Sequence, residues 1–173
     1  IAVGVKGFAI YSIPAGVGTP LHIASVLAKP LYNAQHRAEL LARLDALEPT
    51  RAPAWGRMTA PQMVAHLTEA YRMPHGDLRI RRRRVPGRAL VRWLLLYVFP
   101  FPKGAPTARE LLARVPTTWP DDLARLRALV AESGPPDPAV AIGDHPLFGA
   151  LSPKDWGVLL YKHTDHHLRQ FGV

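Results

Sequence analysis

Two histidines near the C-terminus have the spacing of a pair of metal ligands. His163 and His167 are four residues apart, which on an α-helix places them one turn apart, where both imidazoles can bind one ion. The surrounding residues predict such a helix. Ser152 suits the N-cap, Pro153 the first helical position and Gly172 the end of the helix.

The helix face that carries this pair is otherwise mostly apolar. At about 100° per residue, it also holds four further residues: Trp156, Leu159, Leu160 and Gln170. Lys162 falls away from this face. Imidazoles within an apolar stripe are costly to bury without a partner. They are therefore either hydrogen-bonded core residues or metal ligands, and helical spacing alone leaves both interpretations open.

A metal site usually needs at least three protein ligands, and His66 is the best candidate for the third. Thr59, Pro61 and Gln62 form a capping box with an early proline, which predicts that a helix starts at Thr59. His66 falls on the apolar face of that helix, whereas Glu69 lies off it, where we expect a solvated charge. Three neutral imidazoles leave a coordination position open, which is typical of catalytic zinc sites.

Two further side chains on the C-terminal helix are candidates for supporting roles. Gln170 lies one turn beyond His167, where we expect it to hold a ligand imidazole or the substrate, or else to make a helix-end hydrogen bond. His166 lies at the flank of the apolar stripe, and we expect it behind a ligand or at the rim of the site. No residue stands out as a general acid, so the catalytic residues stay unassigned.

The elements that must position these histidines are predicted to be helices throughout. From Leu31 onward the hydrophobic periodicity is helical, and no strand pattern or internal repeat competes with it. The chain is therefore predicted to be all-α, with one domain over residues 31–173. Helices are expected over 34–47, from Thr59, over 88–99, over 108–114, from Thr118 to a stop at Gly134, and after Ser152.

Residues 1–30 do not share this pattern. The segment is apolar but interrupted by proline and glycine, and it begins with Ile1 rather than methionine. We expect a weakly ordered, irregular N-terminal arm; a signal peptide is the alternative, although no convincing cleavage site follows the apolar run.

Several segments together resemble the DinB/YfiT-like superfamily, and more narrowly one of its bacterial branches without an assigned activity. They are residues 55–67, 101–107, 146–149, 156–157 and 163–172. The resemblance covers the chain from about residue 31 to its end. It implies an up-and-down four-helix bundle, here with extra short helices, and a three-histidine site for a divalent metal. Carried over by position, the ligands are His66, His163 and His167.

The resemblance also implies a type of activity. Characterised members are metal-dependent thiol S-transferases or thiol-dependent isomerases. We therefore expect a metal-dependent transferase or hydrolase-like enzyme that activates a thiol or water, with Zn or Ni as the ion, a low-molecular-weight thiol as a candidate co-substrate, and a small molecule as substrate. The sequence does not decide whether the protein is catalytic, and it leaves a homodimer open.

An arginine-rich stretch is the second unusual feature. Seven arginines lie between Arg79 and Arg92 with no acidic residue among them, in a chain of formal net charge +9. The stretch is either a solvated loop, an anion site or a membrane-surface contact. For the anion site we single out four residues: Arg81, Arg82, Arg83 and Arg84. The membrane alternative rests on the apolar, aromatic residues 89–101 that follow.

This stretch also supports an alternative function. A non-catalytic, metal-binding helical bundle could use the arginine-rich loop to bind a membrane surface or a protein partner. Nucleic acid is not expected, because one arginine loop lacks stacking aromatics and a groove-binding motif.

Composition limits the chemistry further. The chain contains no cysteine, which excludes disulfides, thiolate ligands and a cysteine nucleophile, and fits a cytoplasmic location. No run of 18 apolar residues is present, so a membrane-spanning helix is not expected.

Overall fold

The computed structural model describes residues 29–78, 80–81, 84–105, 107–135 and 143–173. Their regular structure is helical, and the described residues contain no strand, only an isolated bridge between His145 and Gly149. The all-α prediction is confirmed. In chain order, the elements are α2 (Ala34–Asp45), α3 (Ala60–Arg72), α4 (Arg88–Trp93), the π-helical turn η1 (Leu94–Val98), the 3₁₀ turn η2 (Arg109–Leu112), α5 (Trp119–Glu132) and α6 (Pro153–Gln170).

The two helices that carry the histidines begin where the sequence predicts. At the start of α3, the Thr59 side chain accepts a hydrogen bond from the Gln62 backbone N–H, and the Gln62 side chain accepts one from the Thr59 backbone N–H. Ser152 and Asp155 make the same reciprocal pair at α6. Each cap satisfies backbone donors that the helix itself cannot, a contribution of about 1 kcal/mol.

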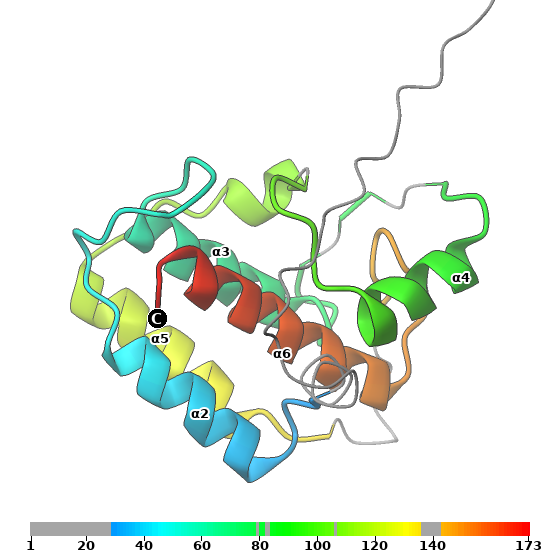
Figure 1. The fold of residues 1–173 in the computed structure, drawn as a ribbon, viewed down its shortest axis with the longest axis horizontal. Helices are drawn as coiled ribbons and strands as arrows, with labels where there is room; N and C mark the ends of the chain where they lie inside the picture. The colour runs from blue at the N-terminus through cyan, green and yellow to red at the C-terminus, as the bar shows by residue number, and fades with distance from the viewer. Residues whose placement is uncertain (1–28, 79, 82–83, 106, 136–142) are drawn as a thin grey trace, which may run out of the picture.

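The four longest helices pack around one another. Helix α2 contacts both α5 and α6, and α3 also contacts both α5 and α6. Figure 1 shows α6 lying between α3 and α2. The predicted N-terminal arm lies outside the described residues, apart from Lys29 and Pro30.

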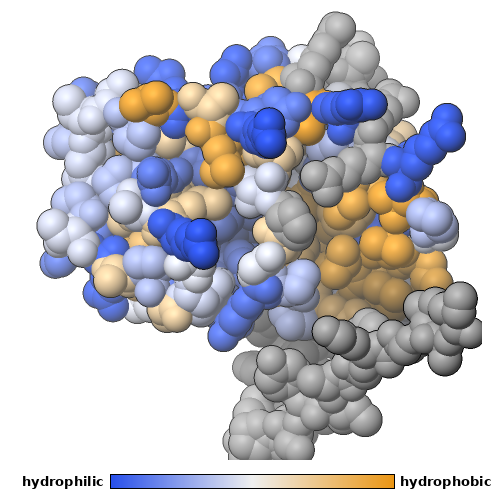
Figure 2. All heavy atoms as spheres, turned by 90° about the horizontal axis from the view of Figure 1, so that it is seen from above, coloured by the Kyte–Doolittle hydropathy of each residue, from blue (hydrophilic) through white to orange (hydrophobic). Residues whose placement is uncertain are grey.

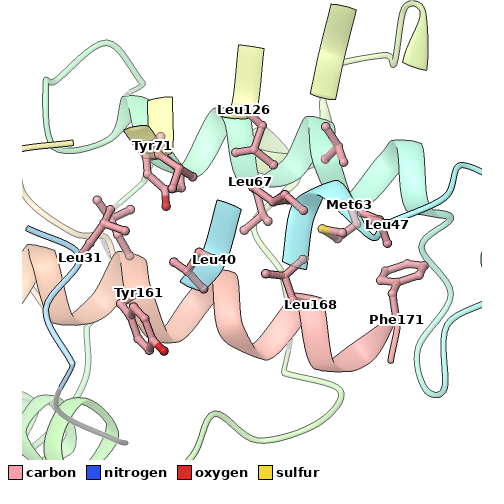
Figure 3. Packing of buried hydrophobic residues seen from close by; sticks show 14 of the residues in the cluster. Leu31, Leu40, Leu47, Met63, Leu67, Tyr71, Leu126, Tyr161, Leu168 and Phe171 are labelled. Carbon is pink, nitrogen blue, oxygen red and sulfur yellow. The ribbon is translucent and has the colours of Figure 1, made fainter. Parts of the chain in front are cut away.

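Between these helices lies the larger hydrophobic cluster. Leu40 of α2, Leu67 of α3 and Leu168 of α6 point towards one another in Figure 3, and all three are fully buried. Each buried leucine of this kind contributes about 2 kcal/mol through the apolar surface that it removes from water. Leu126 extends the cluster onto α5.

A second cluster lies on another side of α6. It joins Trp156 and Leu159 of α6 to Leu96 of η1 and Phe148. Helix α6 is therefore buried on more than one side, and the single apolar stripe predicted from its sequence describes only part of its contacts. The three-histidine face lies on this same helix.

Lys162 is the clearest departure from the predicted stripe. Although its position falls away from the histidine face, its side chain is buried, and its Nζ donates to the carbonyl oxygens of Leu95, Leu96 and Phe99. These carbonyls belong to the end of η1, where the helix has no internal donor for them. Burial lowers the pKa of Lys162 from 10.5 to about 8. One ammonium group thus fastens η1 to α6.

The segment predicted as one helix over 88–99 is α4 followed by η1 and ends at Val98. It packs loosely on the rest of the protein, since Leu96 is its only buried residue from Arg88 to Val98. Figure 1 shows α4 at the edge of the molecule. In Figure 2, hydrophobic residues gather on one side of the face that is shown.

Candidate metal centre

Three histidines meet at the interface of α3 and α6, and we refer to His66, His163 and His167 as the three-histidine cluster. Their Nε2 atoms converge: His163 Nε2 lies 2.9 Å from His66 Nε2 and 3.2 Å from His167 Nε2. One nitrogen from each ring falls within 4.8 Å of the other two. Among the described residues, this is the only group of three or more histidine, cysteine or acidic side chains close enough to hold an ion.

Two of the three rings are held from behind by hydrogen-bond acceptors. His66 Nδ1 lies 3.3 Å from the carbonyl oxygen of Leu111 in η2, and His167 Nδ1 lies 2.8 Å from Oε1 of Gln170. An acceptor at Nδ1 places the ring proton there and leaves the Nε2 lone pair directed into the cluster. Gln170 is fixed in turn, because its Nε2 donates to the carbonyl oxygen of Trp55 at 2.6 Å.

The electrostatics keep all three rings neutral at pH 7. Burial lowers the pKa of His66 to about 4. Burial and the neighbouring His66 lower the pKa of His167 to about 3. The same two causes, burial first and the adjacent histidines second, hold the pKa of His163 well below 6.5. Neutral imidazole is the form that binds metals, so protons do not compete for this site at neutral pH.

This donor arrangement fits a divalent metal ion. The Nε2 lone pairs of His66 and His167 both point at His163 Nε2, and with the His163 proton on Nδ1 a cation between the three nitrogens would bind all three lone pairs. Imidazole nitrogens bound tetrahedrally to zinc at about 2.05 Å lie about 3.3 Å apart, close to the two Nε2–Nε2 distances in the cluster. No acidic side chain belongs to the group.

Glu69 differs from its prediction. It is buried rather than solvated, its Oε2 accepts from Arg72 at 2.8 Å, and its Oε1 lies 3.9 Å from Arg114. Packing of η2 against α3 covers this position, and the two arginines compensate its charge. Glu69 is therefore a buried ion-pair partner of these arginines rather than a member of the three-histidine cluster.

The cluster opens onto a large cavity. The cavity has a volume of about 840 Å³ and is lined by all three histidines of the cluster. Its size falls within the range of sites that bind small organic molecules. The ring centroid of Phe101 lies 6.2 Å from that of His163, so an aromatic wall borders the half-buried member of the cluster.

The two residues predicted to support the ligands both lie at the cavity, but in different surroundings. Gln170 and His166 both line the cavity. His166 stands outside the cluster, with its ring centroid 5.8 Å from Trp55 and 6.1 Å from Phe101. Burial, reinforced by the charge of Arg169, lowers its pKa.

The four arginines predicted to bind an anion do not form one site in the described structure. Arg81 lines the cavity, whereas Arg84 is exposed and does not. Arg82 and Arg83 lie outside the described residues. Of the two that the structure describes, Arg81 lines the cavity and Arg84 does not.

Several groups at the site were not predicted as site residues. The Leu111 carbonyl contacts His66, the Trp55 carbonyl accepts from Gln170, and the Phe101 ring borders His163, each from a segment distant in sequence. His145 also lines the cavity; its Nδ1 accepts the backbone N–H groups of Leu147 and Phe148, both at 3.2 Å. Burial lowers the pKa of His145 to about 4. Loop residues of this kind are recognised only once the loops are placed.

Comparisons of the chain with family models, with curated proteins and with solved structures found no match. Among the described helices, none is both long enough and apolar enough to cross a membrane. The chemistry open to the site follows from the three-histidine cluster and its cavity.

Proposed function

We propose that the protein is a metal-dependent enzyme of the DinB/YfiT type, in which His66, His163 and His167 hold a divalent ion and a thiol or water is activated for transfer or hydrolysis. The observation that carries this proposal is the convergence of the Nε2 atoms of three neutral imidazole rings at the wall of a large cavity. Zn and Ni are the proposed ions, because imidazole suits both. A low-molecular-weight thiol in the cytoplasm is the proposed co-substrate.

The proposal includes the four-helix bundle of that superfamily. Helices α2, α3, α5 and α6 would be its four members, and α4, η1 and η2 its extra short elements. The pattern of contacts supports this arrangement, since α2 and α3 each pack against both α5 and α6. Both ligand-bearing helices, α3 and α6, would then face the interior of the bundle.

The residues of the chain prepare the site in three ways. The Leu111 carbonyl and Gln170 fix the rings of His66 and His167, so that their lone pairs need no reorientation. Phe101 and other apolar side chains border His163 along the cavity. The cavity volume gives room for a substrate beside the cluster. A bound divalent ion would supply a Lewis acid that lowers the pKa of a thiol or water molecule.

Metal analysis of the full chain tests this proposal. We expect about one equivalent of a divalent metal in the purified wild type, and its loss in His66→Ala, His163→Ala and His167→Ala, with helicity by circular dichroism retained. His75→Ala is the matched control, because His75 is exposed and outside the cluster. Wild-type protein that is metal-free and also fails to bind added Zn or Ni would refute the site. A screen of thiols with electrophiles then tests turnover, which should be lost in His163→Ala.

A second candidate function is attachment to an anionic membrane surface. Leu90, Trp93 and Phe99 are 61, 54 and 52 % exposed, and these large apolar side chains lie within ten residues of the chain. The segment overlaps the end of the arginine-rich stretch, which contains no acidic residue. Exposed aromatics and arginines together suit the headgroup region of a bilayer that contains anionic lipids. This function requires no catalysis.

Vesicle sedimentation tests the membrane candidate. The full chain should bind phosphatidylcholine vesicles only when they contain phosphatidylserine, and added salt should weaken binding. Leu90→Ser combined with Trp93→Ser should abolish it, whereas Val115→Ser should not, because Val115 is 79 % exposed but lies outside α4 and η1. Equal binding by the double variant, or equal binding without phosphatidylserine, would contradict this function.

A further inference from the structure

The cavity beside the three-histidine cluster has walls of a distinctive composition. Most of its lining side chains are apolar, and they include Phe101, Leu111 and Trp156. None of the described lining residues is acidic, whereas three are arginines: Arg57, Arg81 and Arg114. A ligand that fills this cavity must therefore match both an apolar lining and the positive charge of these arginines.

One hydrogen-bond donor among the lining residues is defined by His145. Its Nδ1 accepts two backbone N–H groups, so the proton of the neutral ring lies on Nε2. The indole Nε1 atoms of Trp55 and Trp156 also have no acceptor among the described residues, but both atoms are fully buried and do not face the cavity. A ligand with an oxygen acceptor complements His145.

The arginines differ in how their charge is compensated. Arg114 is paired with Asp122 at 2.7 Å and approaches Glu69. Arg57 and Arg81 are exposed, and neither makes an ion pair or a side-chain hydrogen bond within the described part of the chain. Guanidinium groups of this kind bind carboxylates, phosphates and sulfonates through paired hydrogen bonds. The free positive charge at the cavity wall favours an anionic ligand.

We propose that this cavity binds an apolar organic anion, with the hydrophobic body against Phe101, Leu111 and Trp156 and the anionic group at one of the two unpaired arginines, Arg57 or Arg81. The inference rests on the proposed function, for which it names the substrate class. A small hydrophilic anion would leave the apolar wall in contact with water, and a neutral hydrocarbon would leave Arg57 and Arg81 without a counter-charge. A molecule with both an apolar body and an anionic group matches both features of the cavity.

Calorimetric titration of the full chain with three matched probes tests this inference. Decanoate carries the apolar body and the anion, decanol the same chain without charge, and acetate the anion without the chain. We expect decanoate to bind about tenfold or more tightly than decanol, a ratio worth about 1.4 kcal/mol, and acetate to bind undetectably. Binding of decanol as tight as that of decanoate would overturn the anionic part, and an absence of decanoate binding would overturn the whole inference.

Variants locate the two parts of the ligand. Arg57→Ala combined with Arg81→Ala should weaken decanoate binding about tenfold, and leave decanol unaffected. Arg84→Ala is the matched control, because Arg84 is exposed but does not line the cavity. Phe101→Ala should weaken both probes. An unchanged decanoate affinity in the double arginine variant, with the fold verified by circular dichroism, would refute the assigned position of the anion.

The metal content of the same samples separates this inference from the proposed function. Titrations are made with chelator-treated and with zinc-loaded protein. Metal binding without any decanoate binding would refute the ligand class and leave the metal centre standing. Decanoate binding by protein that takes up no metal would support the ligand class as a binding site and refute the metal-dependent function.

Discussion

Gln170 provides a sharp test of how the cluster is prepared for an ion. Its Oε1 accepts from His167 Nδ1 at 2.8 Å, and its Nε2 donates to the Trp55 carbonyl at 2.6 Å. Replacing it with methionine keeps a long, unbranched side chain but removes both hydrogen bonds. The His167 ring can then hold its proton on Nε2, where the proton blocks the lone pair that faces His66 and His163.

The expected loss follows from that change. Residues that hold a metal-bound histidine by its outer nitrogen typically contribute about 10- to 100-fold to metal affinity, or about 1.4–2.8 kcal/mol. Gln170→Met should therefore weaken zinc binding by a factor in this range, measured by competition with a chromophoric chelator at pH 7.5. Because the Trp55 carbonyl also loses its donor, the free energy of unfolding of the metal-free protein should fall by about 1–3 kcal/mol.

An exposed glutamine provides the control for Gln170→Met. Gln35→Met changes the same side chain on the exposed surface of α2 and should leave both quantities unchanged. If folded Gln170→Met bound zinc within twofold of the wild type, Gln170 would not position His167, and the tautomer argument would be wrong.

Three further predictions concern the packing and protonation of the site. Gly56 has φ +82°, and a Cβ there would lie 2.6 Å from Gln170 Nε2, so Gly56→Ala should weaken zinc binding. Gly76→Ala is the control: Gly76 has φ +74° and no atom within 4 Å of the added Cβ, so this variant should show only the cost of backbone strain. A zinc affinity of Gly56→Ala equal to that of Gly76→Ala would contradict the contact with Gln170. Lys162→Met should lower the free energy of unfolding by about 1–3 kcal/mol, because three carbonyl oxygens at the end of η1 lose their donor, and urea unfolding that matches the wild type would refute that role. The folded-state pKa of His66, about 4, lies below its ordinary 6.5, so the unfolded chain binds the proton first as the pH falls. The metal-free protein should therefore lose about 1.4 kcal/mol of stability per pH unit for this residue between about pH 6.5 and 4, and a stability independent of pH over that range would contradict a buried neutral ring.

Local sequence determined where the two histidine-bearing helices begin and which face of each carries the histidines. The capping boxes at Thr59 and Ser152 act over three residues, so they mark the starts of α3 and α6 without help from the rest of the chain. Helical periodicity then places His66 on one face of α3 and His163 with His167 on one face of α6. That these faces meet was an expectation from the apolar stripes and from the resemblance, and the structure brings the three rings together.

Tertiary packing decided everything that depends on a partner distant in the chain. Lys162 is buried because η1 ends against α6 with carbonyl oxygens that need a donor, although helical spacing alone directs it away from the histidine face. Glu69 is buried because η2 brings Arg114 close to it. The Leu111 carbonyl in η2 reaches His66, and the Trp55 carbonyl reaches Gln170, from segments whose paths no periodicity encodes. Periodicity reports which side of a helix is apolar, whereas the identity of each neighbour is set by long-range packing.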